Sequence, residues 1–346
     1  MTAIVCGHIS CYYFPSWLTS FWPVAFFFWV AGFFIKEESL YKPVTFICHK
    51  LKTIYLPGTF IYLIAVLLHN PLCRWGVYPL GEVHPMTGKE YVLWDFNTYL
   101  IQIVKTIFAP SGELAMGAMW FLYILFFALC ILSLVAYFAK WLVKDNSKRI
   151  FFWAALLVML STTSIVLKIY GITIPRMSQA MTVTSFFLCG MVLKQKLELK
   201  YNNWMTLIVA IVIYTQCVFL PHPHPSFPTN TFPDIVLPMA MGVAGLYIIM
   251  FLSKIIERVP IFTRAISYVG RESLYIMALH IFGLFLCNTF IEALGIGRGL
   301  DMVGTLYTYN VGHNIILGLL YLAFGLFVPL ASLQLFRFVK SRTIRK

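Results

Sequence analysis

Long apolar runs recur from one end of this chain to the other, and they constrain its fold more than any other feature. Many contain about 18 or more apolar residues, and a helix needs roughly 20 residues to cross a bilayer. Only 11% of the 346 residues are charged, and 60% are hydrophobic. Soluble domains are about 25% charged, and a soluble core could not hide so much apolar surface. We therefore predict a single membrane domain over residues 1–346, an all-α, polytopic integral membrane helical bundle.

Hydropathy, with proline, glycine and charge as boundaries, predicts about ten transmembrane helices. Their expected ranges are 1–14, 17–35, 53–69, 116–138, 150–168, 178–193, 204–220, 235–252, 272–291 and 311–336. The first range is too short to span a bilayer, and apolar sequence begins at Met1. We therefore expect the first helix to be partial or truncated at the N-terminus.

The basic residues predict how these helices are oriented. Twenty of the 26 Lys and Arg residues fall in one alternating set of loops and the C-terminal tail, and six fall in the other set. Cytoplasmic loops carry the excess of Lys and Arg, so both termini are predicted to be cytoplasmic. The net charge of +13 does not predict nucleic-acid binding, because such a site needs these residues gathered on one face.

The cysteines and the loop histidines do not predict a metal site. The eight cysteines are scattered singly, without a CxxC pair and mostly inside apolar runs, as small buried hydrophobic residues are. His222 and His224 lie in a proline-rich loop, and two ligands do not complete a zinc site. We expect no metal.

Two histidines inside predicted membrane helices are the first candidates for chemistry. His8 lies in the first apolar range, and His280 lies deep in the ninth. A titratable side chain well inside a span costs about 2.5 to 3.5 kcal/mol on insertion scales, so each needs a reason. A neutral imidazole can serve as the general base that activates a hydroxyl. The alternative is that each histidine is a hydrogen-bonded packing residue between helices.

Basic residues at two predicted helix ends could bind an anionic cofactor from the cytosol. Lys50 and Lys52 stand just before the third helix, and Arg271 opens the ninth. They could contact phosphate groups, or they could be solvated anchors at anionic lipid. The sequence contains no Walker loop, dinucleotide fingerprint, HExxH or GxSxG pattern, so nucleotide hydrolysis and serine-hydrolase chemistry have no support.

Four separated segments carry a family pattern. They are Val5-Cys6-Gly7-His8 followed by Phe26-Phe27-Phe28 and Gly32-Phe33-Phe34, then Lys50-Leu51-Lys52 leading to Pro57, then Met119-Trp120-Phe121-Leu122, and last Tyr268-Val269-Gly270-Arg271-Glu272-Ser273-Leu274-Tyr275 ending at His280. Together and in this order they resemble the membrane acyltransferase-3 family. The resemblance covers essentially the whole chain.

The resemblance implies an activity, and it adds His8, Lys50, Ser273 and His280 as family positions to the candidates from the residues themselves. Members of this family move acyl groups, commonly acetyl, onto sugars of surface polysaccharides, lipopolysaccharide or peptidoglycan. His8 takes the place of the family's catalytic histidine. The predicted catalytic residues are His8 and His280, the predicted donor-binding residues are Lys50, Lys52, Arg271 and Ser273, and the predicted acceptor-binding residues are Trp120 and Glu113.

The sequence departs from the family pattern in three ways. The family usually carries an arginine about eleven residues before the first-helix histidine, and this sequence has no residue there. Ala31 stands where the family has the serine of its SGFF motif. Arg271 and Glu272 replace a lysine and an asparagine, so Glu272 reverses the polarity expected beside the donor.

The sequence thus predicts an acyltransferase of a bacterial inner membrane. It would transfer an acetyl group from acetyl-CoA to a hydroxyl of a cell-surface or lipid-linked carbohydrate, with His8 as the general base. The alternative is a membrane transporter or flippase, in which buried histidines relay protons. A passive scaffold would leave His8 and His280 without a purpose.

Overall fold

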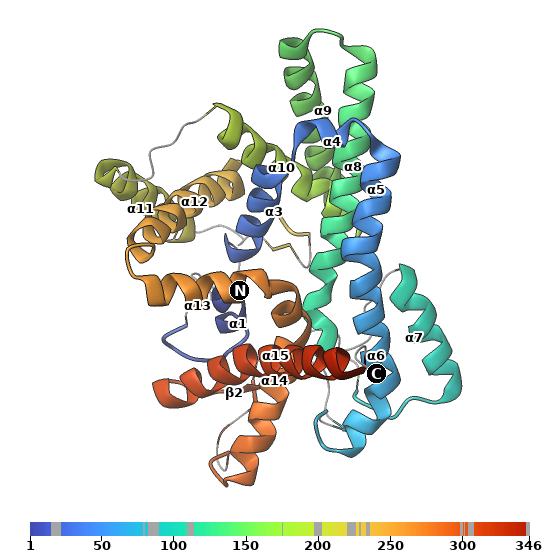
Figure 1. Cartoon of the computed structure of the whole chain (residues 1–346), viewed down its shortest axis with the longest axis vertical. Helices are drawn as coiled ribbons and strands as arrows, with labels where there is room; N and C mark the ends of the chain where they lie inside the picture. The colour runs from blue at the N-terminus through green and yellow to red at the C-terminus, as the bar shows by residue number, and fades with distance from the viewer. Residues whose placement is uncertain are drawn as a thin grey trace. The chain divides into compact units, whose positions relative to one another are not determined.

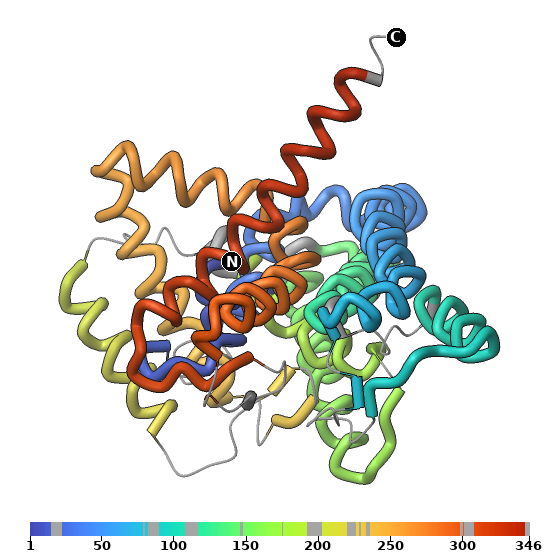
Figure 2. The backbone as a smooth tube through the Cα atoms, turned by 90° about the horizontal axis from the view of Figure 1, so that it is seen from below, coloured from blue at the N-terminus to red at the C-terminus, as the bar shows by residue number. Residues whose placement is uncertain are grey.

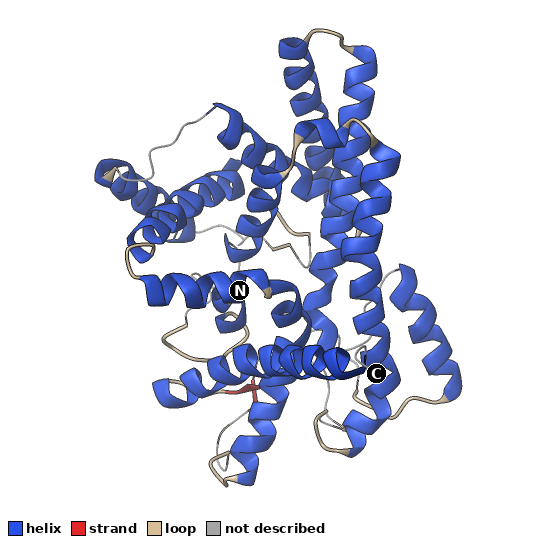
Figure 3. Cartoon of the chain, viewed as in Figure 1, coloured by secondary structure: helices blue, strands red, loops and turns tan. Residues whose placement is uncertain are grey.

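The computed structural model describes residues 1–14, 22–78, 80–81, 90–108, 114–174, 176–196, 203–219, 226–227, 230–232, 236–297, 300, 302–303 and 308–343. Most of them are helical (Figure 3). The two strands in this part of the chain, β1 (Met302–Val303) and β2 (Thr308–Tyr309), pair as one short antiparallel hairpin. The prediction of an all-α fold is confirmed.

Six of the described helices are long and apolar enough to cross a membrane, judged by length and composition. They cover Pro43–Arg74, Gly117–Leu142, Lys148–Ile169, Val236–Ile256, Ser273–Ala293 and Ile315–Arg342. Two shorter apolar helices cover Pro23–Phe34 and Trp204–Phe219. The chain is a multi-pass membrane protein, while the count of ten helices and the cytoplasmic termini stay predictions.

The contacts within the chain define two compact units whose segments alternate along the sequence. Unit 1 contains Met1–Ser20, Gly58–Trp120 and Ala265–Lys346, and unit 2 contains Phe21–Pro57 and Phe121–Arg264. Both histidines that the sequence singles out therefore belong to unit 1.

Unit 2 is held together by a close approach of two helices. Its elements are α3 (Trp22–Phe34), α4 (Glu37–Leu40), α5 (Pro43–Lys50), the π-helical η1 (Leu51–Tyr55), α8 (Trp120–Leu142) after its first residue, α9 (Asn146–Ile169), α10 (Met177–Lys196), α11 (Trp204–Phe219) and α12 (Val236–Ile256). A Cβ atom on Gly32 of α3 would lie 2.2 Å from the carbonyl oxygen of Phe187 in α10. A Cβ atom on Gly190 would lie 2.1 Å from the carbonyl oxygen of Trp29. Only glycine at these positions lets the two backbones touch, which is a common device of membrane helices.

Unit 1 uses the same device at a second helix pair. Its elements are α1 (Thr2–Cys6), most of α6 (Leu56–Arg74), α7 (Phe96–Phe108), the 3₁₀ segment η2 (Leu114–Met119), the end of α13 (Pro260–Arg271), α14 (Ser273–Ala293), the hairpin and α15 (Ile315–Thr343). The last of these is one continuous helix (Figure 2), and it packs along α14 (Figure 1). A Cβ atom on Gly283 would lie 2.5 Å from the carbonyl oxygen of Phe324, and one on Gly325 would lie 2.5 Å from Val5 Cγ1. Glycine therefore brings α14, α15 and α1 together.

The first segment differs from the predicted helix over 1–14. The helix ends at Cys6, and the next residues turn, with the His8 amide donating to the Val5 carbonyl at 3.0 Å. The backbone then runs beside residues 311–312, where the Val311 amide donates to the Ser10 carbonyl at 3.1 Å and the Tyr12 amide donates to the Gly312 carbonyl at 2.8 Å. Two causes end the helix early. Gly7 is a poor helix former, and pairing with a distant segment satisfies the backbone that a longer helix would have used.

Candidate active site

His280 lies on the buried face of α14, and its ring has a defined orientation. The side chain is fully buried, and Nδ1 lies 2.9 Å from the carbonyl oxygen of Ile276 and 3.0 Å from that of Met277. Carbonyl oxygens only accept hydrogen bonds, so Nδ1 carries the hydrogen and donates it to them. The lone pair of the neutral ring is therefore on Nε2.

The Nε2 atom of His280 is the unsatisfied atom of this candidate site. It is buried and has no hydrogen-bond partner within the part of the chain that the structure describes. A buried acceptor left unpaired costs about 1 to 3 kcal/mol, so native proteins rarely keep one without a reason. The helix backbone thus fixes the ring and leaves a basic nitrogen facing the interior.

His8 lies beside this ring. It sits in the turn after α1, half-buried, with its ring centroid 5.2 Å from that of His280 and the ring planes at 33°. The hydroxyl of Thr308, in β2, donates to the His8 carbonyl oxygen at 3.5 Å and links this turn to the hairpin. The structure therefore brings together the two histidines that the sequence could identify only separately.

A second polar cluster of unit 1 lies toward the other end of α14. The Tyr321 hydroxyl donates to Asn288 Oδ1 at 2.5 Å, and the Tyr309 amide donates to the Tyr321 hydroxyl oxygen at 3.1 Å. The Tyr309 hydroxyl in turn donates to Glu292 Oε1 at 2.9 Å. Burial, followed by the hydrogen bond to the Glu292 carboxylate, raises the pKa of Tyr309 to about 12, so its phenol stays protonated at neutral pH.

The sequence analysis missed this cluster, although part of it could have been found. Asn288 lies eight residues after His280 in one helix, and that spacing places both on the same face. A second polar residue on the His280 face of a membrane helix is a usable signal. Tyr309 and Tyr321 could not have been found, because they come from other segments.

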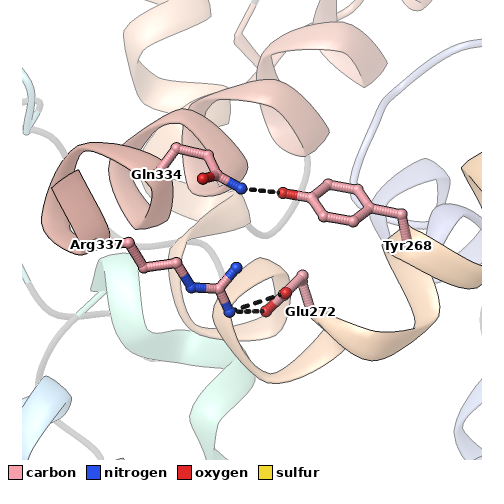
Figure 4. Close-up of polar contacts among 4 residues, drawn as sticks. All are labelled: Tyr268, Glu272, Gln334 and Arg337. Atoms are coloured by element: carbon pink, nitrogen blue, oxygen red, sulfur yellow. Dashed lines mark hydrogen bonds and ion pairs between the residues drawn. The ribbon is translucent and has the colours of Figure 1, made fainter. Parts of the chain in front are cut away.

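The start of α14 carries an ion pair that the sequence did not predict (Figure 4). Arg337 Nη2 of α15 donates to Glu272 Oε1 at 2.9 Å and to Oε2 at 3.0 Å, and Gln334 Nε2 donates to the Tyr268 hydroxyl oxygen at 2.5 Å. Arg337 thus neutralises the carboxylate that departs from the family pattern. Arg271, directly before Glu272, is exposed.

The predicted donor-binding residues are divided between the two units. Arg271 ends α13 and Ser273 begins α14, both in unit 1, whereas Lys50 and Lys52 belong to unit 2. Lys50 ends α5 with its Nζ 5.4 Å from the centroid of the Phe46 ring, and Lys52 is exposed in η1. A π-helical turn inside a helix is frequent at functional sites. Whether these four residues share a ligand stays a prediction.

The structure describes one of the two predicted acceptor-binding residues. Trp120 is the first residue of α8 and is half-buried. Glu113 lies outside the described residues. Across the described ranges, no group of three His, Cys, Asp or Glu side chains could hold a metal ion.

Apolar helices define the class of this chain as a membrane protein, and the rings of two histidines lie side by side in its unit 1. A family model described as an acyltransferase domain matches residues 1–334. The chain belongs to the acyltransferase-3 family, so the resemblance seen in its four motifs is confirmed and the chain is a membrane acyltransferase. Comparison with curated proteins and with solved structures found no match in either set.

Proposed function

We propose that this protein transfers an acetyl group from acetyl-CoA to a hydroxyl of a cell-surface or lipid-linked carbohydrate. The observation that supports this most directly is the unpartnered Nε2 of His280 beside the ring of His8, in a chain of the acyltransferase-3 family. Transfer to a hydroxyl needs a base that removes the hydroxyl proton.

The two imidazoles have different environments and therefore different proposed roles. His8 is half-buried in a turn, so a substrate hydroxyl can reach it, whereas His280 is fully buried. In the proposed arrangement His8 is the catalytic base. His280 is the positioning residue, because its Nε2 can accept the N–H of His8 and leave the other nitrogen of His8 free for the substrate. The centroid separation of 5.2 Å is compatible with an N–H···N hydrogen bond between two imidazoles.

The proposed reaction balances without a further reactant. The acceptor hydroxyl gives its proton to His8 as its oxygen attacks the thioester carbonyl carbon. The carbon–sulfur bond then breaks, and the coenzyme A thiolate takes the proton back from His8 to leave as a thiol. A basic nitrogen placed in this way contributes typically about 10²- to 10⁴-fold to the rate.

The donor is proposed to bind from the cytosol. Acetyl-CoA carries several phosphate charges, and most Lys and Arg residues lie in the loops that the charge pattern places inside. We propose that Lys50, Lys52, Arg271 and Ser273 contact these phosphates. Trp120 and Glu113 are proposed to contact the acceptor, and the protein is proposed to span a bacterial inner membrane with both termini inside.

Mass spectrometry of the envelope glycans tests the proposed reaction. Strains with the gene, without it, and with the gene for His8→Ala are compared, and the intact gene alone should add a mass of one acetyl unit per modified sugar. Purified protein in nanodiscs should release coenzyme A only when de-O-acetylated glycan is present. Identical glycan masses in all three strains would overturn the proposal.

Reporter fusions test the orientation separately. Fusions after Lys346 and near Lys196 should report the cytoplasm, and a fusion near Pro225 should report the outside. An external C-terminus would overturn the cytosolic placement of the donor site.

A further inference from the structure

Three exposed aromatic rings lie together on the segment that holds His8 and on the segment that pairs with it. Tyr12 is 68% exposed and Tyr13 is 51% exposed, and His313 is also exposed. The ring centroid of Tyr12 lies 4.4 Å from that of His313, and that of Tyr13 lies 5.8 Å from that of Tyr12. The Tyr13 and His313 centroids are 6.3 Å apart, so the three rings form one cluster.

The backbone beneath these rings is firmly held. The backbone amide of Tyr12 donates a hydrogen bond to the Gly312 carbonyl at 2.8 Å, and that of Asn314 donates one to the Val311 carbonyl at 2.8 Å. Gly312 has φ +51, a conformation that favours glycine and that turns the chain between the pairing residues and His313. Cys11 is buried against α15, where a Cβ atom on Gly318 would lie 2.8 Å from its sulfur. The rings are thus presented outward from a packed base.

The same packed backbone also holds His8, the proposed catalytic histidine. Tyr12 follows His8 by four residues in one short segment, and Thr308, whose hydroxyl binds the His8 carbonyl, precedes His313 by five residues. The same pair of segments therefore positions both His8 and the exposed rings.

Two polar side chains lie near His313 in the sequence. Asn310 and Asn314 flank His313 and are exposed. The Oδ1 atom of Asn310 accepts from the Gly312 amide at 3.2 Å, and that of Asn314 accepts from the Leu317 amide at 3.1 Å. Each oxygen is thereby committed to the backbone, and the NH₂ groups are the donors that these amides have left to offer. Such a surface combines aromatic faces with hydrogen-bond donors.

We propose that Tyr12, Tyr13 and His313 form an aromatic platform on which a sugar ring of the acceptor glycan stacks, placing a hydroxyl at His8. A sugar ring has faces of C–H groups, and the electron-rich face of an aromatic ring attracts their weakly positive hydrogens. Its hydroxyls can accept from the amide groups nearby. This inference rests on the proposed function, and it identifies where the acceptor binds.

Tyrosines are also enriched at membrane–water interfaces, so the alternative is that Tyr12 and Tyr13 contact lipid. Interfacial tyrosines anchor helices in lipid. Tyr12 and Tyr13 lie in a turn outside any described helix, and their partner is a titratable histidine flanked by two amides. These features favour a sugar over lipid as the occupant.

Kinetics with de-O-acetylated envelope glycan of the host test the platform. Tyr12→Ala with Tyr13→Ala should raise KM for the glycan about tenfold, while kcat and KM for acetyl-CoA stay unchanged, because only uniform binding of the acceptor is lost. Tyr12→Phe with Tyr13→Phe should restore the low KM. Tyr170→Ala, which removes a tyrosine that is 77% exposed in unit 2, is the matched control and should change nothing.

A binding measurement separates the failure of this inference from failure of the proposed function. Nanodisc-embedded protein is passed over the immobilised de-O-acetylated glycan, in the absence of acetyl-CoA. Retention that is lost in the double alanine variant and restored by phenylalanine supports the platform even if no acetyl group is ever transferred. Unchanged KM or retention in the alanine variant, or loss of thermal stability alone, would overturn it, as would absence of binding by the unaltered protein.

Discussion

The polar cluster between α9 and α10 in unit 2 and the histidine pair in unit 1 both place polar groups among apolar helices, but they differ in how completely those groups are hydrogen-bonded. In unit 2 the hydroxyls bond to one another, with Ser161 Oγ donating to Ser185 Oγ at 2.9 Å and Thr182 Oγ1 donating to Ser164 Oγ at 3.0 Å. Asn230 Nδ2 adds a bond to Ser164 Oγ at 3.3 Å. Every one of these residues is buried and hydrogen-bonded.

In the histidine pair, hydrogen bonding within the described residues is incomplete. The Nδ1 atom of His280 is bonded to two carbonyls, whereas its Nε2 has no partner in the described chain. The hydroxyl cluster is therefore typical of polar contacts that hold membrane helices together, whereas the unpaired nitrogen of the histidine pair agrees with the proposed role in proton transfer. A polar residue in a membrane helix is thus better judged by its unsatisfied atoms than by its presence.

The largest expected effect is that of His8→Ala, which should lower kcat by at least about 100-fold, because it removes the proposed general base. The variant should stay inserted and folded, with a stability change of roughly 0.6 kcal/mol, the average for a hydrogen bond between membrane helices. Acetyl transfer and thermal unfolding are measured on one nanodisc preparation. Near-normal turnover would assign His8 to packing and move the search for the base to His280.

A smaller loss, about tenfold, is expected for His280→Asn. Asparagine can keep the donor to the Ile276 and Met277 carbonyls through its NH₂ group, but it has no nitrogen that can take a proton. We expect kcat to fall and the pH profile of kcat to change, with the melting temperature nearly unchanged. His280→Ala serves as the comparison that also loses the donor. An Asn variant with normal kcat and an unaltered pH profile would reduce His280 to a packing residue like those of unit 2.

The predicted donor residues should show a binding effect of about fivefold. Lys50→Ala with Arg271→Ala should raise KM for acetyl-CoA, because two phosphate contacts are lost. Stability should change by less than about 0.5 kcal/mol, as is usual for surface positions. Arg271 is exposed, and Lys50 is half-buried at a helix end. Lys254→Ala with Arg258→Ala removes the same charge from exposed positions and is the control. Equal effects of the two double variants would make Lys50 and Arg271 topology anchors.

The smallest effect on activity is expected from the hydroxyl cluster. Ser161→Ala should cost roughly 0.6 kcal/mol of stability, with turnover per folded molecule within about twofold of the unaltered protein, because this cluster takes no part in proton transfer. Thermal unfolding and active-site titration in the same nanodiscs measure both quantities. A large loss of turnover in Ser161→Ala would break the distinction between the two clusters.

Some helices could be predicted within a few residues. The range 150–168 corresponds to α9, Asn146–Ile169, and the range 272–291 to α14, Ser273–Ala293. Both are long apolar runs bounded by charge, so the cost of exposing backbone to lipid fixes them locally. The predicted helix over 1–14 was wrong after Cys6, because the residues that follow pair with a segment near the other end of the chain.

The sequence identified the residues of the candidate site but could not predict how they are arranged. His8 and His280 stood out as titratable groups in apolar sequence, and the four motifs indicated the family that the match over residues 1–334 confirmed. The bond from Arg337 to Glu272 could not be predicted, because a carboxylate at a helix start gives no signal of which distant cation will meet it.

The sequence by itself determined that this chain lies in a membrane as a set of helices, because apolar composition and backbone hydrogen bonding are local properties of each run. Only the tertiary structure decided that His8 and His280 lie side by side, that Nε2 of His280 has no partner among the described residues, and that Tyr12 lies beside His313. These contacts join segments from opposite ends of the chain. They depend on how closely α1, α14 and α15 can pack. Gly283 and Gly325 allow this close packing because they have no side chain.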